Sequence, residues 1–186
     1  MSLKLPALFL VCLLLVACKL PSGDNGLSFG LTEEPTVTES PVPYTGCYFN
    51  WATQPLPDLS LEVQAAMETA GLEGVTAIAE AYGENCYDSQ TNEVVYFATL
   101  ETDFRVTVEV DNLEDTVALG DMLELILVTL DQFPPGATSG PQPGYIGVNF
   151  IKGEETLYLW FTVIDGESAR ALGLHGADLL EELQNR

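Results

Sequence analysis

The chain has 186 residues, and 47% of them are hydrophobic, which is enough to build a core. All 28 acidic residues follow Cys18, whereas only five of the six basic residues do, so the formal charge beyond that position is −23. A surface this acidic repels nucleic acid and anionic lipid headgroups, and we exclude both as partners. The roughly 140 residues after position 45 suit one domain with one core.

The first 17 residues have the composition of an export signal. One basic residue, Lys4, precedes an apolar run from Leu5 to Ala17. Thirteen helical residues rise about 20 Å, which is less than the roughly 30 Å hydrocarbon core of a membrane. A basic start, a short apolar run and small residues at its end are typical of a signal peptide, which we predict over residues 1–17.

The apolar run ends in Leu15-Val16-Ala17-Cys18. This tetrapeptide resembles the lipobox of bacterial lipoproteins. The resemblance implies that Cys18 receives a diacylglyceryl group and becomes the first residue after cleavage, which anchors the protein to the extracytoplasmic face of a cell membrane. Two or more acyl chains hold a protein far longer than one. An ordinary signal peptide and an uncleaved membrane anchor are the alternatives.

Residues 18–45 are predicted to form a flexible tether between the lipid and the folded part. They are rich in serine, threonine, proline, glycine and glutamate and show no apolar periodicity. A coil of about 27 residues has a root-mean-square reach of roughly 25–30 Å. We therefore place the folded domain at residues 46–186.

Two cysteines of the expected domain, Cys47 and Cys86, form an even pair. Outside the cytoplasm such a pair predicts a disulfide, which the loop-entropy model values at roughly 3–4 kcal/mol. The alternative is a two-thiol metal site. It lacks supporting ligands, because the single histidine of the chain, His175, lies far along the sequence.

Residues 47–57 read as a loop, and the first regular element follows them. Apolar side chains at helical spacing predict a helix over residues 59–70, between Pro57-Asp58 as its start and Gly71 as its stop. Runs rich in valine, tyrosine and phenylalanine then predict strands over residues 75–82, 94–100 and 103–110. The last two runs form either two strands or one long strand bent near Thr102.

A second helix is predicted over residues 113–132, which Pro134-Pro135 would end. A proline and glycine loop leads into two strands, 145–152 and 156–164, joined by a tight turn at residues 153–155. Both faces of the second strand are apolar or aromatic, which indicates a central strand covered on both sides. Two short helices, 167–172 and 177–183, complete the chain.

The order of these elements predicts an α+β fold. Strands joined by short turns favour a mostly antiparallel sheet, here of about four to five strands, with helices packed on one face. Two successive units of a helix and a hairpin also suggest a pseudo-repeat.

No catalytic residue can be assigned from the sequence. His175 lacks a recognisable nucleophile, and neither a Gly-x-Ser-x-Gly elbow nor a nucleotide-binding glycine loop is present. Glu101 and Asp103 would face the same side of an extended strand, but a carboxylate pair needs a cleft to hydrolyse a sugar. Asp111–Asp115 and Asp165 are more simply explained as helix caps.

No cofactor or metal is assigned either. Calcium is the metal that an exterior, oxygen-rich protein would most easily bind, but no run matches the Asp-x-Asp-x-Asp-Gly pattern of a calcium loop.

Two loops have the composition of binding loops. One, residues 47–57, contains Tyr48, Phe49 and Trp51 beside the expected disulfide, and the other, residues 133–145, is rich in proline and ends in Tyr145. Exposed aromatic side chains on loops often anchor a partner. The alternative is that the aromatics cover an edge of the core and that the second loop is a spacer.

These observations favour a non-catalytic binding or interaction module that recognises a protein, a peptide or an envelope component. The alternatives are an extracellular acid-dependent hydrolase and an accessory subunit of an envelope complex.

Overall fold

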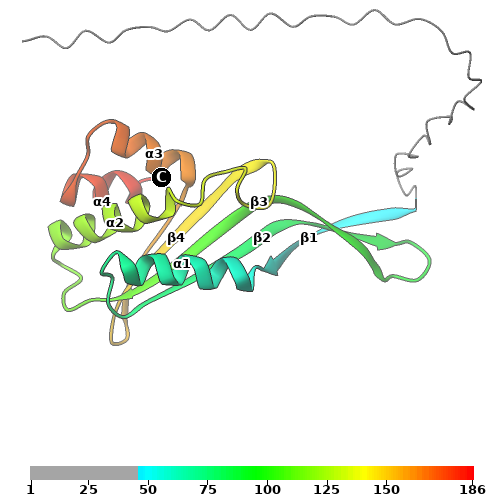
Figure 1. Cartoon of the computed structure of the whole chain (residues 1–186), viewed down its shortest axis with the longest axis horizontal. Helices are drawn as coiled ribbons and strands as arrows, with labels where there is room; N and C mark the ends of the chain where they lie inside the picture. The colour runs from blue at the N-terminus through cyan, green and yellow to red at the C-terminus, as the bar shows by residue number, and fades with distance from the viewer. Residues whose placement is uncertain (1–45) are drawn as a thin grey trace, which may run out of the picture. The chain divides into compact units, whose positions relative to one another are not determined.

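A computed structural model of the chain describes residues 46–186 (Figure 1). Its elements, in chain order, are β1 (Cys47–Pro55), α1 (Pro57–Thr69), β2 (Val75–Asp88), β3 (Val94–Glu109), α2 (Thr116–Leu130), β4 (Gln142–Lys152), β5 (Glu155–Thr162), α3 (Val163–Ala171) and α4 (Gly176–Gln184). The predicted signal peptide, the predicted lipidation site Cys18 and the predicted tether lie outside the described residues. None of the helices that the structure describes is long and apolar enough to cross a bilayer.

The five strands form one sheet in the order β1-β2-β3-β4-β5. Three of the four neighbouring pairs are antiparallel, and β3 with β4 is the parallel pair. Because parallel neighbours need a crossover, α2 lies between β3 and β4 in the sequence. The predicted α+β fold with a mostly antiparallel sheet is confirmed, and the order helix, strand, strand occurs twice, as α1-β2-β3 and α2-β4-β5.

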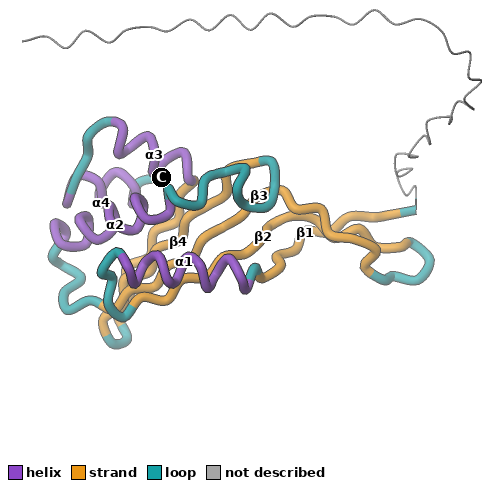
Figure 2. Tube along the Cα trace, in the orientation of Figure 1, coloured by secondary structure: helices purple, strands orange, loops and turns teal. Residues whose placement is uncertain are grey.

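The helices gather over one face of the sheet (Figure 2). Alternate residues of the strands point toward them and form the core with the apolar faces of the helices, as the period of two requires. The core includes Ala79, Phe104, Val106, Val148, Phe150 and Phe161 from the sheet and Val63, Met67, Leu123, Ile126, Leu179 and Leu180 from the helices. We call the opposite side the open face. Its residues include Ile78, Glu80, Tyr82, Glu101, Asp103, Arg105, Tyr145, Gly147, Tyr158 and Trp160.

Helix α1 closes part of one sheet edge with polar side chains. β1 pairs with β2 between residues 80 and 88, which leaves the start of β2 without a neighbouring strand on that side. There Ala77 N donates to Gln64 Oε1 (2.7 Å), Gln64 Nε2 donates to Val75 O (2.9 Å), and Ala79 N donates to Ser60 Oγ (2.9 Å). These side chains satisfy backbone groups that would otherwise offer a template for another strand.

Two sequence-based expectations about the sheet are wrong. Residues 47–55 form an edge strand, β1, rather than a loop, because pairing with β2 satisfies their backbone despite the weak alternation. The aromatic run in β5 is not a central strand, since β5 is the other edge of the sheet. Its outward side chains, Tyr158 and Trp160, pack against other rings on the open face instead of under a covering layer.

Residues 94–100 and 103–110 belong to one long strand, β3. This was one of the two alternatives expected from the sequence, the other being two separate strands. Its pairing with β2 shifts between Tyr82 and Gly83, and its pairing with β4 shifts between Thr102 and Phe104. At the first shift the backbones come very close, because a side chain on Gly83 would place its Cβ 2.1 Å from Ala98 O. Glycine at that position therefore allows the strands to bend without separating.

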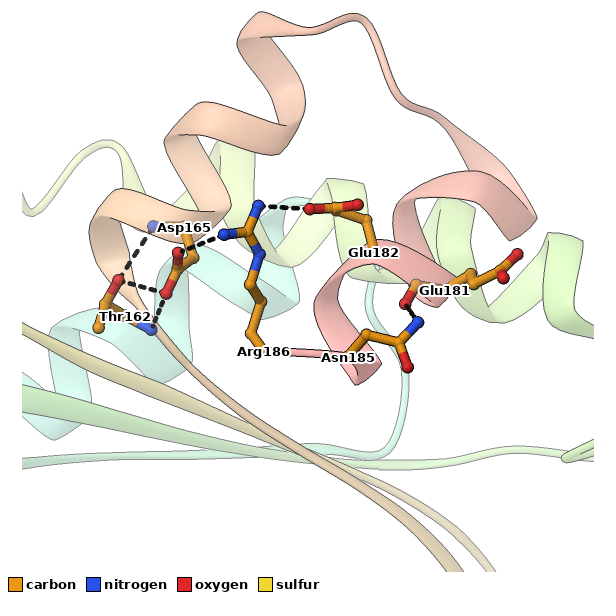
Figure 3. Close-up of polar contacts among 6 residues, drawn as sticks. All are labelled: Thr162, Asp165, Glu181, Glu182, Asn185 and Arg186. Carbon is orange, nitrogen blue, oxygen red and sulfur yellow. Dashed lines mark hydrogen bonds and ion pairs between the residues drawn. The ribbon is translucent and has the colours of Figure 1, made fainter.

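Asp115 caps α2, as expected from the sequence, whereas the N-cap of α3 is Thr162 and Asp165 lies in the first turn of that helix. Asp115 Oδ1 accepts a hydrogen bond from Ala118 N (3.1 Å) at the start of α2. Thr162 and Asp165 form a capping box at the start of α3, and Arg186 ties that box to Glu182 of α4 through ion pairs (Figure 3). The hydrogen bond from the Thr162 hydroxyl lowers the pKa of Asp165, and the Arg186 guanidinium lowers it further.

Candidate binding surface

The far ends of β1, β2 and β3 extend beyond the helices as a narrow ribbon (Figure 1). Six of the thirteen exposed large hydrophobic side chains lie on β1 and β3 there, each 45–58% exposed. These six residues lie on both faces of the ribbon, with Tyr48 on the face opposite to Phe49 and Trp51, and we call the set the ribbon patch: Tyr48, Phe49, Trp51, Val94, Val95 and Tyr96. Apolar side chains scattered singly need no explanation, but a concentration on one projecting element has the character of an interaction surface.

A disulfide and ring contacts hold the ribbon together. Cys47 and Cys86 are bonded, with Cα atoms 5.4 Å apart, which confirms the predicted disulfide and joins β1 to β2. Tyr48 stacks on Tyr87 with ring centroids 5.3 Å apart, and the Tyr48 hydroxyl donates a hydrogen bond to Asn92. The ribbon patch is thus presented by a cross-linked strand pair rather than by a loose loop.

Trp51 lies where the ribbon meets the open face. Its indole stacks on Tyr82 with a centroid distance of 5.3 Å and an angle of 4° between the rings, yet 58% of Trp51 stays exposed. The fourth aromatic residue singled out from the sequence, Tyr145, lies elsewhere, on β4, where it stacks on Trp160. The four aromatic residues therefore lie in two groups, Tyr48, Phe49 and Trp51 on β1 and Tyr145 on β4.

The second group is built around a glycine. A Cβ on Gly147 would lie 2.9 Å from the Trp160 ring, so the indole can lie flat against the sheet only because position 147 has no side chain. Tyr145 stacks on the same indole at 5.3 Å, and the Arg105 guanidinium carbon lies 5.0 Å from its centroid. Sequence reasoning missed Arg105 and Trp160, because their proximity depends on cross-strand register.

Three carboxylates lie on the open face between the two aromatic groups. Glu80 Oε2 accepts from Arg105 Nε (2.8 Å), and Asp103 Oδ1 accepts from Tyr145 N (2.8 Å), where the register of β3 and β4 shifts. Burial raises the pKa of Asp103, although the Tyr145 N–H and Arg105 oppose the rise. Burial also raises the pKa of Glu101, and the Asp103 charge raises it further.

These raised pKa values have a defined consequence for stability. A carboxyl whose folded pKa exceeds its unfolded value favours the folded state below the unfolded pKa, and that contribution is lost as pH rises through the folded pKa. The ordinary values are 4.5 for Glu101 and 3.8 for Asp103. Both carboxyls therefore favour folding more in acid than above their raised pKa values, and perturbed carboxyls of this kind are common at functional surfaces.

The remaining sequence candidates lie apart from this surface. His175 precedes α4, and its Nδ1 lies 2.9 Å from Glu124 Oε2, so an acid is in reach, but the imidazole is largely exposed and no hydroxyl of residues 46–186 bonds to it. The proline loop contributes Phe133 and Pro134 to a hollow of about 250 Å³ beside Arg170. Two guanidinium nitrogens of that arginine bind Asp131 at 2.6 and 2.7 Å.

A shallow hollow of about 860 Å³ lies at the end of the sheet opposite the ribbon. The acidic side chains that line it include Glu109, Asp111 and Asp115. Within residues 46–186, no three histidine, cysteine, aspartate or glutamate side chains gather closely enough to hold a metal ion. The acidity of the described surface is therefore distributed rather than focused on one ion.

The chain matches no protein-family model, no curated protein and no solved structure. The function therefore has to be argued from the surface itself.

Proposed function

We propose that the chain is a lipid-anchored extracytoplasmic lipoprotein whose folded part is a non-catalytic binding module. The observation that carries the proposal is the ribbon patch, with Trp51 as its most exposed aromatic residue. The Leu15–Cys18 tetrapeptide supports the lipid anchor. The disulfide between Cys47 and Cys86 supports an oxidising location outside the cytoplasm.

The ribbon patch has three properties that favour binding. Residues 47–55 and 94–100 contain no charged side chain, so covering them requires little desolvation of charge. The disulfide and the aromatic contacts already order the ribbon, which reduces the entropy lost on association. Tyrosine and tryptophan supply large contact areas with few rotatable bonds, and they are the residues most often found at energetic centres of interfaces.

An acid-dependent hydrolase is the second candidate, and the raised pKa values of Glu101 and Asp103 favour it. Such an enzyme needs one carboxyl to transfer a proton and the other free to act as a base or nucleophile. Asp103, however, already accepts a backbone hydrogen bond from Tyr145, and neither acid lines either of the two hollows described above. These features support binding over catalysis.

A photo-crosslinking amino acid placed at position 51 in cells tests the proposal. We expect a discrete cross-linked species from position 51 and none from position 61, since Leu61 is an even more exposed apolar side chain (70% against 58%) but lies on α1, away from the ribbon patch. Identical patterns from both positions would refute the assignment of the ribbon patch. A complex that survives detergent extraction without cross-linking would indicate a permanent accessory subunit rather than a transient binder.

The anchor is tested separately. A Cys18→Ser variant should move from the detergent phase to the aqueous phase on phase separation, because it cannot be lipidated. Unchanged partitioning would refute the lipoprotein assignment without affecting the argument about the ribbon patch.

A further inference from the structure

A carboxylate without a partner lies next to the Trp51–Tyr82 stack. Glu101 is directly opposite Tyr82 in the pairing of β2 with β3, so the two side chains are neighbours on the open face. Glu101 is only 7% exposed. Its carboxylate makes no hydrogen bond or ion pair with any of residues 46–186. The Glu101 oxygens are not among the buried polar atoms that lack a hydrogen-bond partner, so the carboxylate stays accessible to solvent and to a ligand although most of the residue is covered.

The neighbouring acids do not share this property. Asp103 accepts from the Tyr145 backbone, and Glu80 is paired with Arg105. The other two arginines of the described part are also paired, with acids on α2, α3 and α4, and Lys152 lies in the turn between β4 and β5. No base within residues 46–186 is therefore placed to neutralise Glu101.

The aromatic stack beside Glu101 is suited to a cation. Trp51 is stacked on one side, but more than half of its surface is open, and the face of an indole attracts positive charge within about 6 Å. Glu84 lies opposite Trp51 in the pairing of β1 with β2 and adds a second negative charge nearby. Residues 46–186 contain 24 acids against four bases, so the surrounding field also draws cations toward the surface.

We propose that Trp51, Tyr82 and Glu101 form a binding site for a primary alkylammonium group. This inference rests on the proposed function and names the chemistry recognised where the ribbon meets the open face. Because Tyr82 lies between Glu101 on β3 and Trp51 on β1, the ammonium N–H groups would donate to the Glu101 carboxylate and the alkyl stem would lie across the outer edges of the stacked Tyr82 and Trp51 rings. A quaternary ammonium would still be attracted to the aromatic rings, but it has no N–H to donate to the carboxylate, so we expect it to bind more weakly.

Titration of the full chain with n-butylammonium tests the site. The indole N–H signals of Trp51 and Trp160 in NMR spectra distinguish the two tryptophans, and the Trp51 signal should shift to saturation. Isothermal titration calorimetry, which does not depend on the Trp51 signal, compares the variants, and we expect binding to weaken at least fivefold in Trp51→Ala and in Glu101→Gln. Glu154→Gln, which removes an acid from the turn between β4 and β5, is the matched control and should leave the affinity unchanged.

Three further arms identify the chemistry. Tetramethylammonium should bind more weakly than n-butylammonium, and n-butanol, which has the same stem without the charge, should not saturate. Affinity should also fall as pH drops through the raised pKa of Glu101, and Glu101→Gln should abolish that dependence. A blocked Gly-Lys-Gly peptide that binds at least tenfold more tightly than n-butylammonium assigns the site to lysine in a polypeptide, whereas equal affinity assigns it to a free amine.

Two results would overturn the inference. Equal binding of n-butanol would show an apolar surface only, and equal loss of affinity in the Glu101 and Glu154 variants would show diffuse screening by the acidic surface. If n-butylammonium fails to bind while position 51 still gives a discrete cross-linked species, the cation site is wrong and the proposed function stands. If both fail, the proposed function fails with it.

Discussion

The closest backbone contact between helices predicts an unusual response to a glycine replacement. A Cβ on Gly120 in α2 would lie 1.8 Å from the carbonyl oxygen of Gly176, the first residue of α4, and 2.2 Å from its carbonyl carbon. Helix propensity alone would make Gly120→Ala stabilising by about 1 kcal/mol. The contact reverses the sign, because backbone atoms cannot rotate away as a side chain can.

The magnitude follows from what must move. Non-bonded carbon atoms rest about 3.5–4.0 Å apart, so α4 would have to shift by more than 1 Å from α2. That shift disturbs Leu179, Leu180 and Leu183, which are at most 1% exposed in the core. Overpacking costs typically 1–3 kcal/mol and occasionally more, and here it acts on a whole helix. Because a whole helix is displaced, we take a cost of about 3–4 kcal/mol, at or just above the top of that range, and subtracting the gain of about 1 kcal/mol in propensity leaves a net loss of about 2–3 kcal/mol.

Urea denaturation followed by circular dichroism measures this loss. In thermal unfolding of a domain of this size, the same loss corresponds to a fall in Tm of roughly 5–12 °C. Val128→Ala, an exposed position of the same helix, controls for propensity and should change stability by no more than about 0.5 kcal/mol. If Gly120→Ala is as stable as the wild type, α2 and α4 do not pack backbone to backbone, and the reasoning is refuted.

Three other perturbations have defined outcomes. Replacing both Cys47 and Cys86 by alanine should lower the free energy of unfolding by about 4 kcal/mol, because the bond spans 39 residues of the unfolded chain. Asp165 has a lowered pKa, so the stability it contributes is complete above its ordinary value of 3.8 and is lost as pH falls further. Asp165→Asn should cost about 1 kcal/mol at pH 7 and flatten the decline of stability below pH 4. Gly147→Ala should displace the Trp160 indole and change its fluorescence, at a cost of about 1–3 kcal/mol.

Each of these has a result that contradicts it. A loss below about 1 kcal/mol without the disulfide would mean that the cross-link does not constrain the unfolded chain. If stability falls with pH in the same way in Asp165→Asn and in the wild type, the negative charge of Asp165 does not contribute to the cap of α3. Unchanged emission of Trp160 in Gly147→Ala would mean that the indole does not lie against the sheet at that glycine.

Local periodicity was sufficient to predict most of the regular elements. The alternation of residues 103–110 follows directly from one face packing on the core, and the apolar stripe of α2 follows from its burial between the sheet and α4. The disulfide could be predicted because the expected domain contains only two cysteines, which have one possible pairing, and because an extracytoplasmic location was expected from the sequence. These features depend on short-range patterns or on simple counting.

The expectations that were wrong concern features that depend on the register between strands far apart in the sequence. β1 contains polar residues on both faces, and pairing with β2 rather than periodicity makes it a strand. β5 carries apolar residues on both faces, yet it is an edge strand, since Tyr158 and Trp160 pack against rings from the same and neighbouring strands. The neighbours of Glu101 across the sheet are likewise set by register, so the sequence could place Glu101 on a face but could not show its isolation from any base.

The hydrogen bonds from Ser60 and Gln64 to the start of β2 have a consequence for solubility rather than for folding. The two side chains imitate the backbone of a missing strand, so they block the sheet from extending itself with a second molecule. Loss of the Ser60 or the Gln64 side chain would leave the core intact, but the protein would self-associate more as its concentration rises. If the chain is anchored to a membrane as proposed, the selective pressure on these two polar positions would arise from crowding at the membrane surface, where anchored copies meet far more often than they would in free solution.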